Sequence, residues 1–439
     1  MLLPQNRLLL WVGFALPFAA IGMMTSSAAV VSISVIALLV VVAGVDAAMA
    51  RGQLRGIRVE LPDVVRLSRN REGTIALRIH REGTNARMVR VGLPFPREIS
   101  TPNEDFRVAL PEGAACSQIA WPCTPSKRGN YRLSRCQLEV SSPMGFWSAR
   151  SAMEVASEIR VYPNLLDDRK RLAAIFLNRG SFGVHAQRMI GQGRDFEKLR
   201  DYIPGDSYDQ IHWKATAKRG CPVTKVFQVE RTQEVYVILD YSRLSGRKLD
   251  NDTVLERFIT AALVLGLVAE QQGDLFGLLT FSDRVSGFVR ARNGRAHYDS
   301  CRDTLYTLHP KRVTPDFAEV CAFIRQRLRR RALLVFLTDL DDPVVAESLV
   351  KNVDLIARQH LILISAVRSR NAEPIFKSES AASLDDVYRH LGGHLLWQRA
   401  REVGKVLQRH GVRMLHLDDE KMSAQLVSQY LTIKQRQLL

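Results

Sequence analysis

The stretch Val235-Tyr236-Val237-Ile238-Leu239-Asp240 is a short run of aliphatic and β-branched side chains that ends in a carboxylate. Such a run is typical of a strand that is buried on both faces of a sheet. Further apolar runs of this kind follow at 275–281, 332–337, 361–367 and 413–417. Helical periodicity separates several of them, and strands that alternate with helices predict a mostly parallel sheet. We therefore expect residues 233–439 to form a Rossmann-like α/β domain.

A helix is expected directly after the first of these strands. Asn251 or Asp252 is the predicted N-cap, and Gly273 is the predicted end. Its apolar face is formed by Leu255, Phe258, Ile259, Ala262, Leu263, Gly266 and Ala269. Further helices are expected at 315–330, 384–410 and 421–436.

Two of the predicted strands end in carboxylates, Asp240 and Asp339, and parallel strands end at the same edge of a sheet. The residues after Asp240 resemble the DxSxS loop of von Willebrand factor A-type domains, in which oxygen ligands hold Mg²⁺ or Mn²⁺. The ligands implied by this resemblance are Asp240, Ser242, Ser245, Thr314 and Asp339. Leu244 stands where the second serine belongs, so the loop is degenerate. The alternative is that the two carboxylates cap a loop and a helix.

The N-terminal part of the chain is apolar, and no charged residue occurs from Leu8 to Val45. As one straight helix, this stretch would be about 57 Å long, whereas a bilayer core is about 30 Å thick. The run must therefore be broken, and Thr25-Ser26-Ser27 is the predicted turn. Residues 1–50 are thus expected to form a transmembrane hairpin with spans at 8–24 and 28–45.

Basic residues flank the apolar stretch, with Arg7 before it and Arg51, Arg55 and Arg58 after it. Positive flanks favour the cytoplasmic side. We expect a two-pass inner-membrane protein with its soluble domains in the cytoplasm. The alternative is that the first span is a cleaved signal peptide.

Residues 56–163 have the pattern of short strands. Thr74–His80 alternates polar and apolar side chains, and turn sequences such as Pro111-Glu112-Gly113 recur. This pattern predicts a small β-sandwich. The alternative is a loosely ordered linker.

Residues 164–232 form a polar connector that carries a distinctive motif. It runs as GQGRDFEKLRDYIPGD over 191–206 and IHWKATAKR over 211–219. The motif resembles the signature of the bacterial domain-of-unknown-function family fifty-eight, and the resemblance extends over nearly the whole chain. It departs from the family pattern at Asp209-Gln210, where an arginine is expected. The Gly191-Gln192-Gly193 segment lacks the strand and helix of a nucleotide-binding loop.

The resemblance implies a membrane-anchored, non-enzymatic adaptor that works with a MoxR-type AAA+ ATPase in the assembly or maturation of other complexes. Within the connector, aromatic and charged side chains are interleaved, which suits docking on a partner. The partner-binding candidates are Arg194, Phe196, Arg200, Tyr202, Asp206, Trp213 and Lys214. The alternative is that the connector only joins the sandwich to the α/β domain.

Other functions have some support in the composition. The formal net charge of +17 suits anionic lipids or nucleic acid, but the basic residues are spread along the chain, so no specific nucleic-acid site is expected. A metal-dependent hydrolase would use Asp240, Asp339 and Asp341 or Asp342, but no general base is evident. The six cysteines contain no CxxC motif, which indicates reduced thiols in the cytoplasm.

Overall fold

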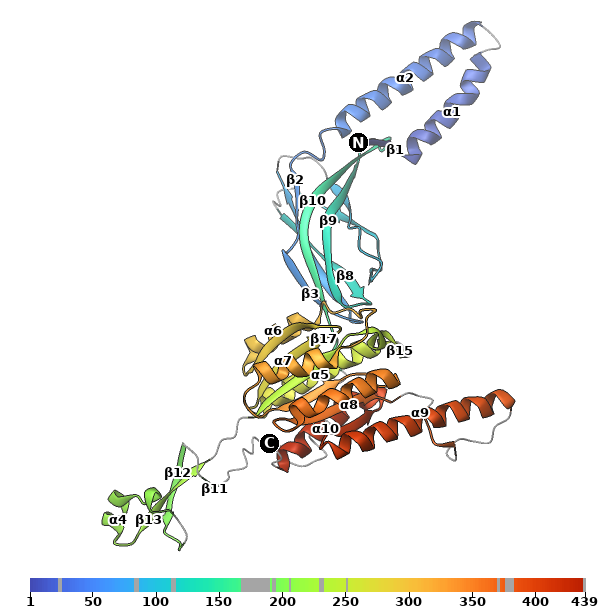
Figure 1. Ribbon diagram of the computed structural model, residues 1–439. Coiled ribbons are helices and arrows are strands. Elements are labelled where there is room, and N and C mark those ends of the chain that lie inside the picture. Colours follow the sequence, from blue (N-terminus) through green and yellow to red (C-terminus); the bar gives the residue numbers. More distant parts are fainter. Residues whose placement is uncertain are drawn as a thin grey trace. The chain divides into compact units, whose positions relative to one another are not determined.

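The computed structural model describes residues 1–22, 26–82, 87–111, 116–166, 190–191, 195–204, 207–228, 233–249, 252–368, 372–375 and 383–436. Contacts divide the chain into two compact units, Met1–Asn164 and Leu165–Leu439. Figure 1 shows both units, with the chain coloured from its N-terminus to its C-terminus.

The first unit begins with two apolar helices, α1 (Asn6–Gly22) and α2 (Ser26–Ala50). They pack against each other, and the Ser32 hydroxyl donates a 2.6 Å hydrogen bond to the carbonyl of Phe18. Among the described residues, one helix is long and apolar enough to cross a membrane, over Ala29–Ala50; the apolar part of α1 is shorter. Of the predicted turn Thr25-Ser26-Ser27, Ser26 and Ser27 are the first residues of helix α2, and Thr25 lies outside the described residues.

The rest of the first unit consists of two β-sheets. One has the strand order β1-β10-β9-β5-β7 with β3 beside β10, and the other has the order β2-β4-β8-β6. The strands are β1 (Leu2–Pro4), β2 (Ile57–Glu60), β3 (Val64–Ser68), β4 (Gly73–Arg81), β5 (Met88–Gly92), β6 (Ile99–Ser100), β7 (Asp105–Ala109), β8 (Cys116–Pro125), β9 (Gly129–Ser141) and β10 (Trp147–Tyr162). Alternate side chains of both sheets, such as Ile75, Trp121 and Leu138, share one core.

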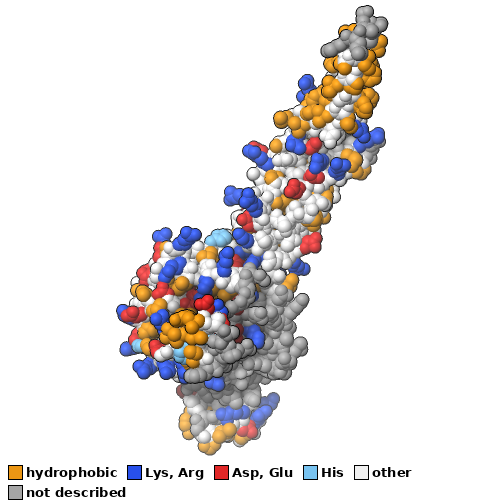
Figure 2. All heavy atoms as spheres, turned by 90° about the vertical axis from the view of Figure 1, so that its right-hand side faces the viewer, with side chains coloured by type: hydrophobic (Ala, Val, Ile, Leu, Met, Phe, Trp, Pro, Cys, Tyr) orange, Lys and Arg blue, Asp and Glu red, His pale blue; other side chains and the backbone are white. Residues whose placement is uncertain are grey.

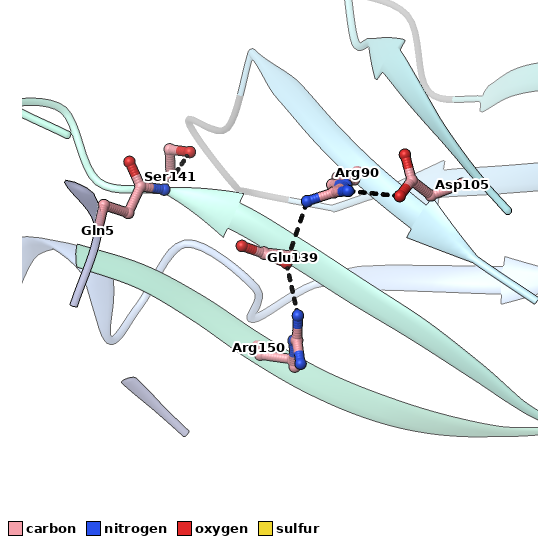
Figure 3. A network of polar contacts seen from close by, with 6 residues as sticks. All are labelled: Gln5, Arg90, Asp105, Glu139, Ser141 and Arg150. Carbon is pink, nitrogen blue, oxygen red and sulfur yellow. Dashed lines mark hydrogen bonds and ion pairs between the residues drawn. The ribbon is translucent and has the colours of Figure 1, made fainter. Parts of the chain in front are cut away.

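Opposite charges line up across neighbouring strands of the larger sheet. Glu139 of β9 lies 3.0 Å from Arg150 of β10 and 4.0 Å from Arg90 of β5 (Figure 3). Arg90 also pairs with Asp105 of β7 at 2.5 Å, which lowers the pKa of that carboxyl group. Cross-strand pairs of opposite charge add modestly to the stability of a sheet.

The second unit contains a small three-stranded sheet and a larger α/β sheet. The small sheet has the order β11-β13-β12, with β11 (Ile190–Gly191), β12 (Asp195–Asp201) and β13 (Val223–Gln228). The short helix α4 (Trp213–Arg219) lies between β12 and β13 in the chain. Most of the connector motif is thus a folded hairpin with a helix inserted in it.

The larger sheet has the strand order β18-β17-β14-β19-β20-β21. Its strands are β14 (Glu234–Asp240), β17 (Leu275–Phe281), β18 (Val285–Arg292), β19 (Leu333–Leu337), β20 (Leu361–Val367) and β21 (Arg413–Leu417). Five strands are parallel, and β18 pairs with β17 in the antiparallel sense. The expected parallel arrangement is present, but the antiparallel edge strand was not predicted, because its side chains are only partly buried and lack a continuous apolar run.

Helices cover both faces of this sheet. They are α5 (Val254–Gln271), α6 (Arg295–Leu305), α7 (Phe317–Arg327), α8 (Pro343–Ala357), α9 (Leu384–Arg409) and α10 (Met422–Gln435). Successive residues of β14 face opposite sides: Val237 packs in a cluster with α5 and α10, and Ile238 packs with α7 and α8. The N-cap of α5 is Thr253, whose side chain accepts from the Glu256 amide, so the expected cap at Asn251 or Asp252 is one or two residues early.

Candidate functional site

The site is the edge of the large sheet where β14 and β19 end. Asp240, the last residue of β14, is 1% exposed. One carboxylate oxygen accepts a 2.8 Å hydrogen bond from the Ser242 amide, and the other accepts a 2.7 Å bond from the Thr338 hydroxyl. Burial raises the pKa of Asp240, and these hydrogen bonds oppose that rise. Thr338 was not predicted as a site residue, although it directly precedes Asp339.

Asp339 follows β19 and is also 1% exposed. Its Oδ1 accepts a 3.1 Å hydrogen bond from the Asp341 amide, and its Oδ2 lies 3.0 Å from Nη2 of Arg247. The same guanidinium pairs with Asp341 through Nη1. Burial raises the pKa of Asp339 to about 6, the Asp341 charge adds to the rise, and Arg247 opposes it. Arg247 was not predicted as a site residue, because it lies outside the DxSxS pattern.

The remaining predicted metal ligands, Ser242, Ser245 and Thr314, do not point to one common position. Ser242 is fully buried. Its hydroxyl lies beside Asp240 and makes no hydrogen bond to any of the residues that the structure describes. The Ser245 hydroxyl donates a 2.7 Å bond to the Ser242 carbonyl. Leu244 packs against the core below the loop. Thr314 is exposed, although Val313 beside it accepts a 3.0 Å bond from the Arg243 amide.

These residues do not fit a bound divalent cation as they stand. The Ser242 hydroxyl has no hydrogen-bond partner within the described part of the chain and is a suitable oxygen ligand, but a guanidinium already lies 3.0 Å from Oδ2 of Asp339. Among the described residues, no group of three or more His, Cys, Asp or Glu side chains is placed to hold a metal ion. The Mg²⁺ or Mn²⁺ site therefore stays a prediction from resemblance.

The exposed rim of the edge carries further charge pairs. Arg243 is half exposed and pairs with Asp342, and Asp342 also caps α8 by accepting from the Val344 amide at 3.0 Å. The predicted helix-capping role thus belongs to Asp342, and Asp240 caps the loop that follows it. Asp341 and Asp342, which were considered for hydrolysis together with Asp240 and Asp339, are each paired with an arginine.

The connector motif presents a second surface. Trp213 begins α4 and is 68% exposed, and Tyr208 is 75% exposed and stacks on Tyr202 at 6.2 Å between ring centroids. His212 caps α4: its Nδ1 accepts a 3.1 Å hydrogen bond from the Ala215 amide.

The other predicted partner-binding residues are placed as follows. Lys214 is exposed, and the Arg200 guanidinium donates a 3.4 Å bond to the Asp201 carbonyl. Phe196 lies on β12, and Arg194 and Asp206 lie outside the described residues.

A third polar cluster, in the first unit, was missed by the sequence analysis. Asp46 of α2 is fully buried, and its carboxylate accepts hydrogen bonds from the Ser142 hydroxyl at 2.5 Å and from the amides of Met144 and Phe146 at 3.1 Å each. The indole of Trp147 donates a 2.9 Å bond to the Ala43 carbonyl. The one signal was an acidic residue directly after the second predicted span.

Part of the chain matches the model of a known protein family. The model of the family described as "Protein of unknown function DUF58" matches residues 198–375, which confirms the resemblance over that stretch. None of the curated proteins matches the chain.

Two solved structures show weak similarity. The crystal structure of the SpRpn10 VWA domain aligns with a TM-score of 0.28 and 11% identity, over 45% of this chain and 95% of that one. A protein of unknown function from Porphyromonas gingivalis aligns with a TM-score of 0.18 and 18% identity, over 25% of this chain and 49% of that one. TM-scores this low establish neither fold nor function.

Proposed function

We propose that this chain, whose residues 198–375 match the DUF58 family, is a membrane-anchored, non-enzymatic adaptor. Its α/β domain, which we assign to the von Willebrand factor A type, would bind a protein partner at the edge where β14 and β19 end. The partner that the family resemblance suggests is a MoxR-type AAA+ ATPase, acting with this chain in the assembly or maturation of other complexes.

The observation that carries the binding role is the way in which the two buried carboxylates are held. Asp240 accepts from a backbone amide and a hydroxyl, and Asp339 accepts from an amide and faces Arg247. A general base must reach the proton that it removes. Carboxylates held on several sides by their own chain instead fix the shape of a loop, and a fixed, charged loop edge suits recognition.

The membrane anchor is supported by the surface of α1 and α2. Large apolar side chains on both helices are exposed, including Phe14 and Leu16 at 66% and Ile33 at 67%. Figure 2 shows hydrophobic side chains gathered on this pair of helices. Exposed apolar surface of this extent is unfavourable in water and favourable in a lipid bilayer. We propose that both helices cross the inner membrane as a hairpin, with the soluble part in the cytoplasm.

The connector surface is a second candidate for partner contact. Exposed aromatic side chains are frequent anchors of protein interfaces, and Trp213 and Tyr208 are both more than two thirds exposed. Helix α4 also carries two exposed basic residues, Lys214 and Lys218, which suit an acidic partner surface. The sheet edge and this surface can be tested separately.

Capture of the partner from detergent extracts tests the proposal. The full-length protein is used as bait beside Arg243→Glu, which reverses an exposed rim charge, and Lys351→Glu, which reverses an exposed charge on α8. The proposal predicts that an AAA+ ATPase is recovered by the native protein and by Lys351→Glu, and in reduced amount by Arg243→Glu. Recovery of no AAA+ ATPase, or turnover of a substrate by the purified protein, would contradict it.

A further inference from the structure

The charge balance at the sheet edge is incomplete without Arg247. Asp240 and Asp339 are both 1% exposed and lie at the ends of neighbouring strands, since Leu239 pairs with Leu337 in the register of β14 and β19. A buried carboxylate is costly unless a counter-charge compensates for it. Arg247 is the cation that the structure places there: its Nη2 is buried and lies 3.0 Å from Asp339 Oδ2.

The backbone around Arg247 fixes where the guanidinium reaches. The 3₁₀ turn Arg243–Gly246 follows Ser242, and the Arg247 amide donates to the Leu244 carbonyl at 3.1 Å. The Arg247 carbonyl accepts a 3.0 Å bond from the amide of Val254, the first residue of α5. The amide and the carbonyl of Arg247 are therefore both hydrogen-bonded to neighbouring secondary-structure elements, which fixes the position of its Cα atom.

One guanidinium spans two carboxylates, because Nη2 faces Asp339 and Nη1 pairs with Asp341. A guanidinium suits this position: it is planar, permanently charged and more weakly hydrated than an ammonium group. Its charge lies against Asp339 Oδ2, an oxygen that receives no hydrogen bond from the described residues. A divalent cation at that oxygen would be repelled by the arginine.

We propose that Arg247 is the built-in cation of this edge and takes the place that a divalent metal holds in the loop that this segment resembles. The positive charge of Arg247 then compensates for the buried carboxylates, and the edge needs no Mg²⁺ or Mn²⁺. For partner recognition this inference rests on the proposed function, and it implies that chelators leave partner binding unchanged. The cation content of the edge can be measured without any partner, so the two ideas can fail separately.

Binding of Mn²⁺, followed by electron paramagnetic resonance on the full-length protein in detergent, tests the inference. The native protein should leave added Mn²⁺ free. Arg247→Met removes the charge and keeps much of the side-chain length, so Asp240, Asp339 and the Ser242 hydroxyl should now bind Mn²⁺. Arg243→Met is the matched control, because that arginine pairs only with the rim residue Asp342 in the contacts described, and it should gain no binding.

Asp240→Asn variants show whether any bound Mn²⁺ lies at this edge. Addition of Asp240→Asn to Arg247→Met should abolish the gained binding, which would assign it to this edge. Mn²⁺ binding by the native protein that is lost in Asp240→Asn would overturn the inference, and this measurement needs no Arg247 variant to fold. A folded Arg247→Met protein that leaves Mn²⁺ free would also overturn it, because Arg247 would then compensate for no latent cation site.

Discussion

The carboxylate of Asp46, near the end of helix α2, accepts a 2.5 Å hydrogen bond from the hydroxyl of Ser142, which lies in the loop between β9 and β10. With the amides of Met144 and Phe146 as further donors, one buried side chain joins the second apolar helix to the β-sandwich. A proposed membrane helix thus ends in a fixed contact with the first soluble domain.

Asp46→Ala should destabilise this joint by about 2–4 kcal/mol, because three donors lose their common acceptor in a buried place. Hydrogen exchange of the Met144 and Phe146 amides in the full-length protein is the direct readout, and both amides should exchange faster. Asp63→Ala, which removes an exposed carboxylate of the same unit, is the control. Unchanged protection in Asp46→Ala would show that the joint does not depend on the carboxylate.

A second buried carboxylate ties the last helix to the α/β sheet. Asp274 is 1% exposed, accepts from the Tyr430 hydroxyl, and lies 2.8 Å from Nζ of Lys434. Tyr430→Phe should cost about 1.5–3 kcal/mol in the free energy of unfolding, since it removes a hydrogen bond to a charged group. Lys434→Met should cost at least as much, because it removes the counter-charge of a buried ion. Denaturant unfolding of both variants measures the two losses of stability. A larger loss for Tyr430→Phe than for Lys434→Met would contradict the prediction.

Thiol reactivity should divide the cysteines into two classes. Cys116 and Cys221 are exposed, and the other four are buried, where burial raises the pKa of Cys123 to about 11 and that of Cys301 to about 12. A raised pKa means less thiolate at a given pH, and a pKa of 11 leaves about one part in a thousand ionised at pH 8. Two thiols per native chain should react with a chromogenic disulfide reagent at pH 8, and six in denaturant. A native count above two would contradict the burial.

The charge row of the larger sandwich sheet should contribute little to stability. Glu139 is 20% exposed in its side chain and lies between Arg90 and Arg150, which are both close to half exposed (Figure 3). Exposed pairs of this kind are worth about 0–1 kcal/mol each. Glu139→Gln should therefore lower the free energy of unfolding by about 1 kcal/mol or less, and the loss should shrink further at high salt. A loss as large as that of Asp46→Ala would contradict this.

The sequence predicted the elements of the α/β sheet well where the apolar pattern was continuous. The strand expected at 361–367 and the strand expected at 413–417 lie at those residues, and α10 differs from its prediction by one residue at each end. Burial on both faces makes such runs uniformly apolar, so they are readily found. Strand β18 was not predicted because it lies at the sheet edge and mixes partly buried with exposed residues in no regular order, so it has no continuous apolar run.

The candidate site could be predicted only in part, for a physical reason. Asp240 and Asp339 were found because strand ends can be read from apolar runs. Arg247 and Asp46 were not found, because their partners are distant in the sequence. Asp339, the partner of Arg247, is 92 residues away, and Ser142, the partner of Asp46, is 96 residues away. Pairing over such distances depends on the folded arrangement, which leaves no local sequence pattern.

The most direct test of the account is the affinity of the full-length protein, held in lipid nanodiscs, for the AAA+ ATPase that it captures. The measurement compares the native protein with Arg243→Glu at the sheet edge and Trp213→Ala on the connector, each in EDTA and in Mg²⁺ without nucleotide. We expect Arg243→Glu to weaken binding about tenfold or more, which corresponds to about 1.4 kcal/mol, with the same affinity in EDTA and in Mg²⁺. Binding that is unchanged by Arg243→Glu would contradict recognition at the sheet edge, and loss of binding in Trp213→Ala alone would assign it to the connector surface.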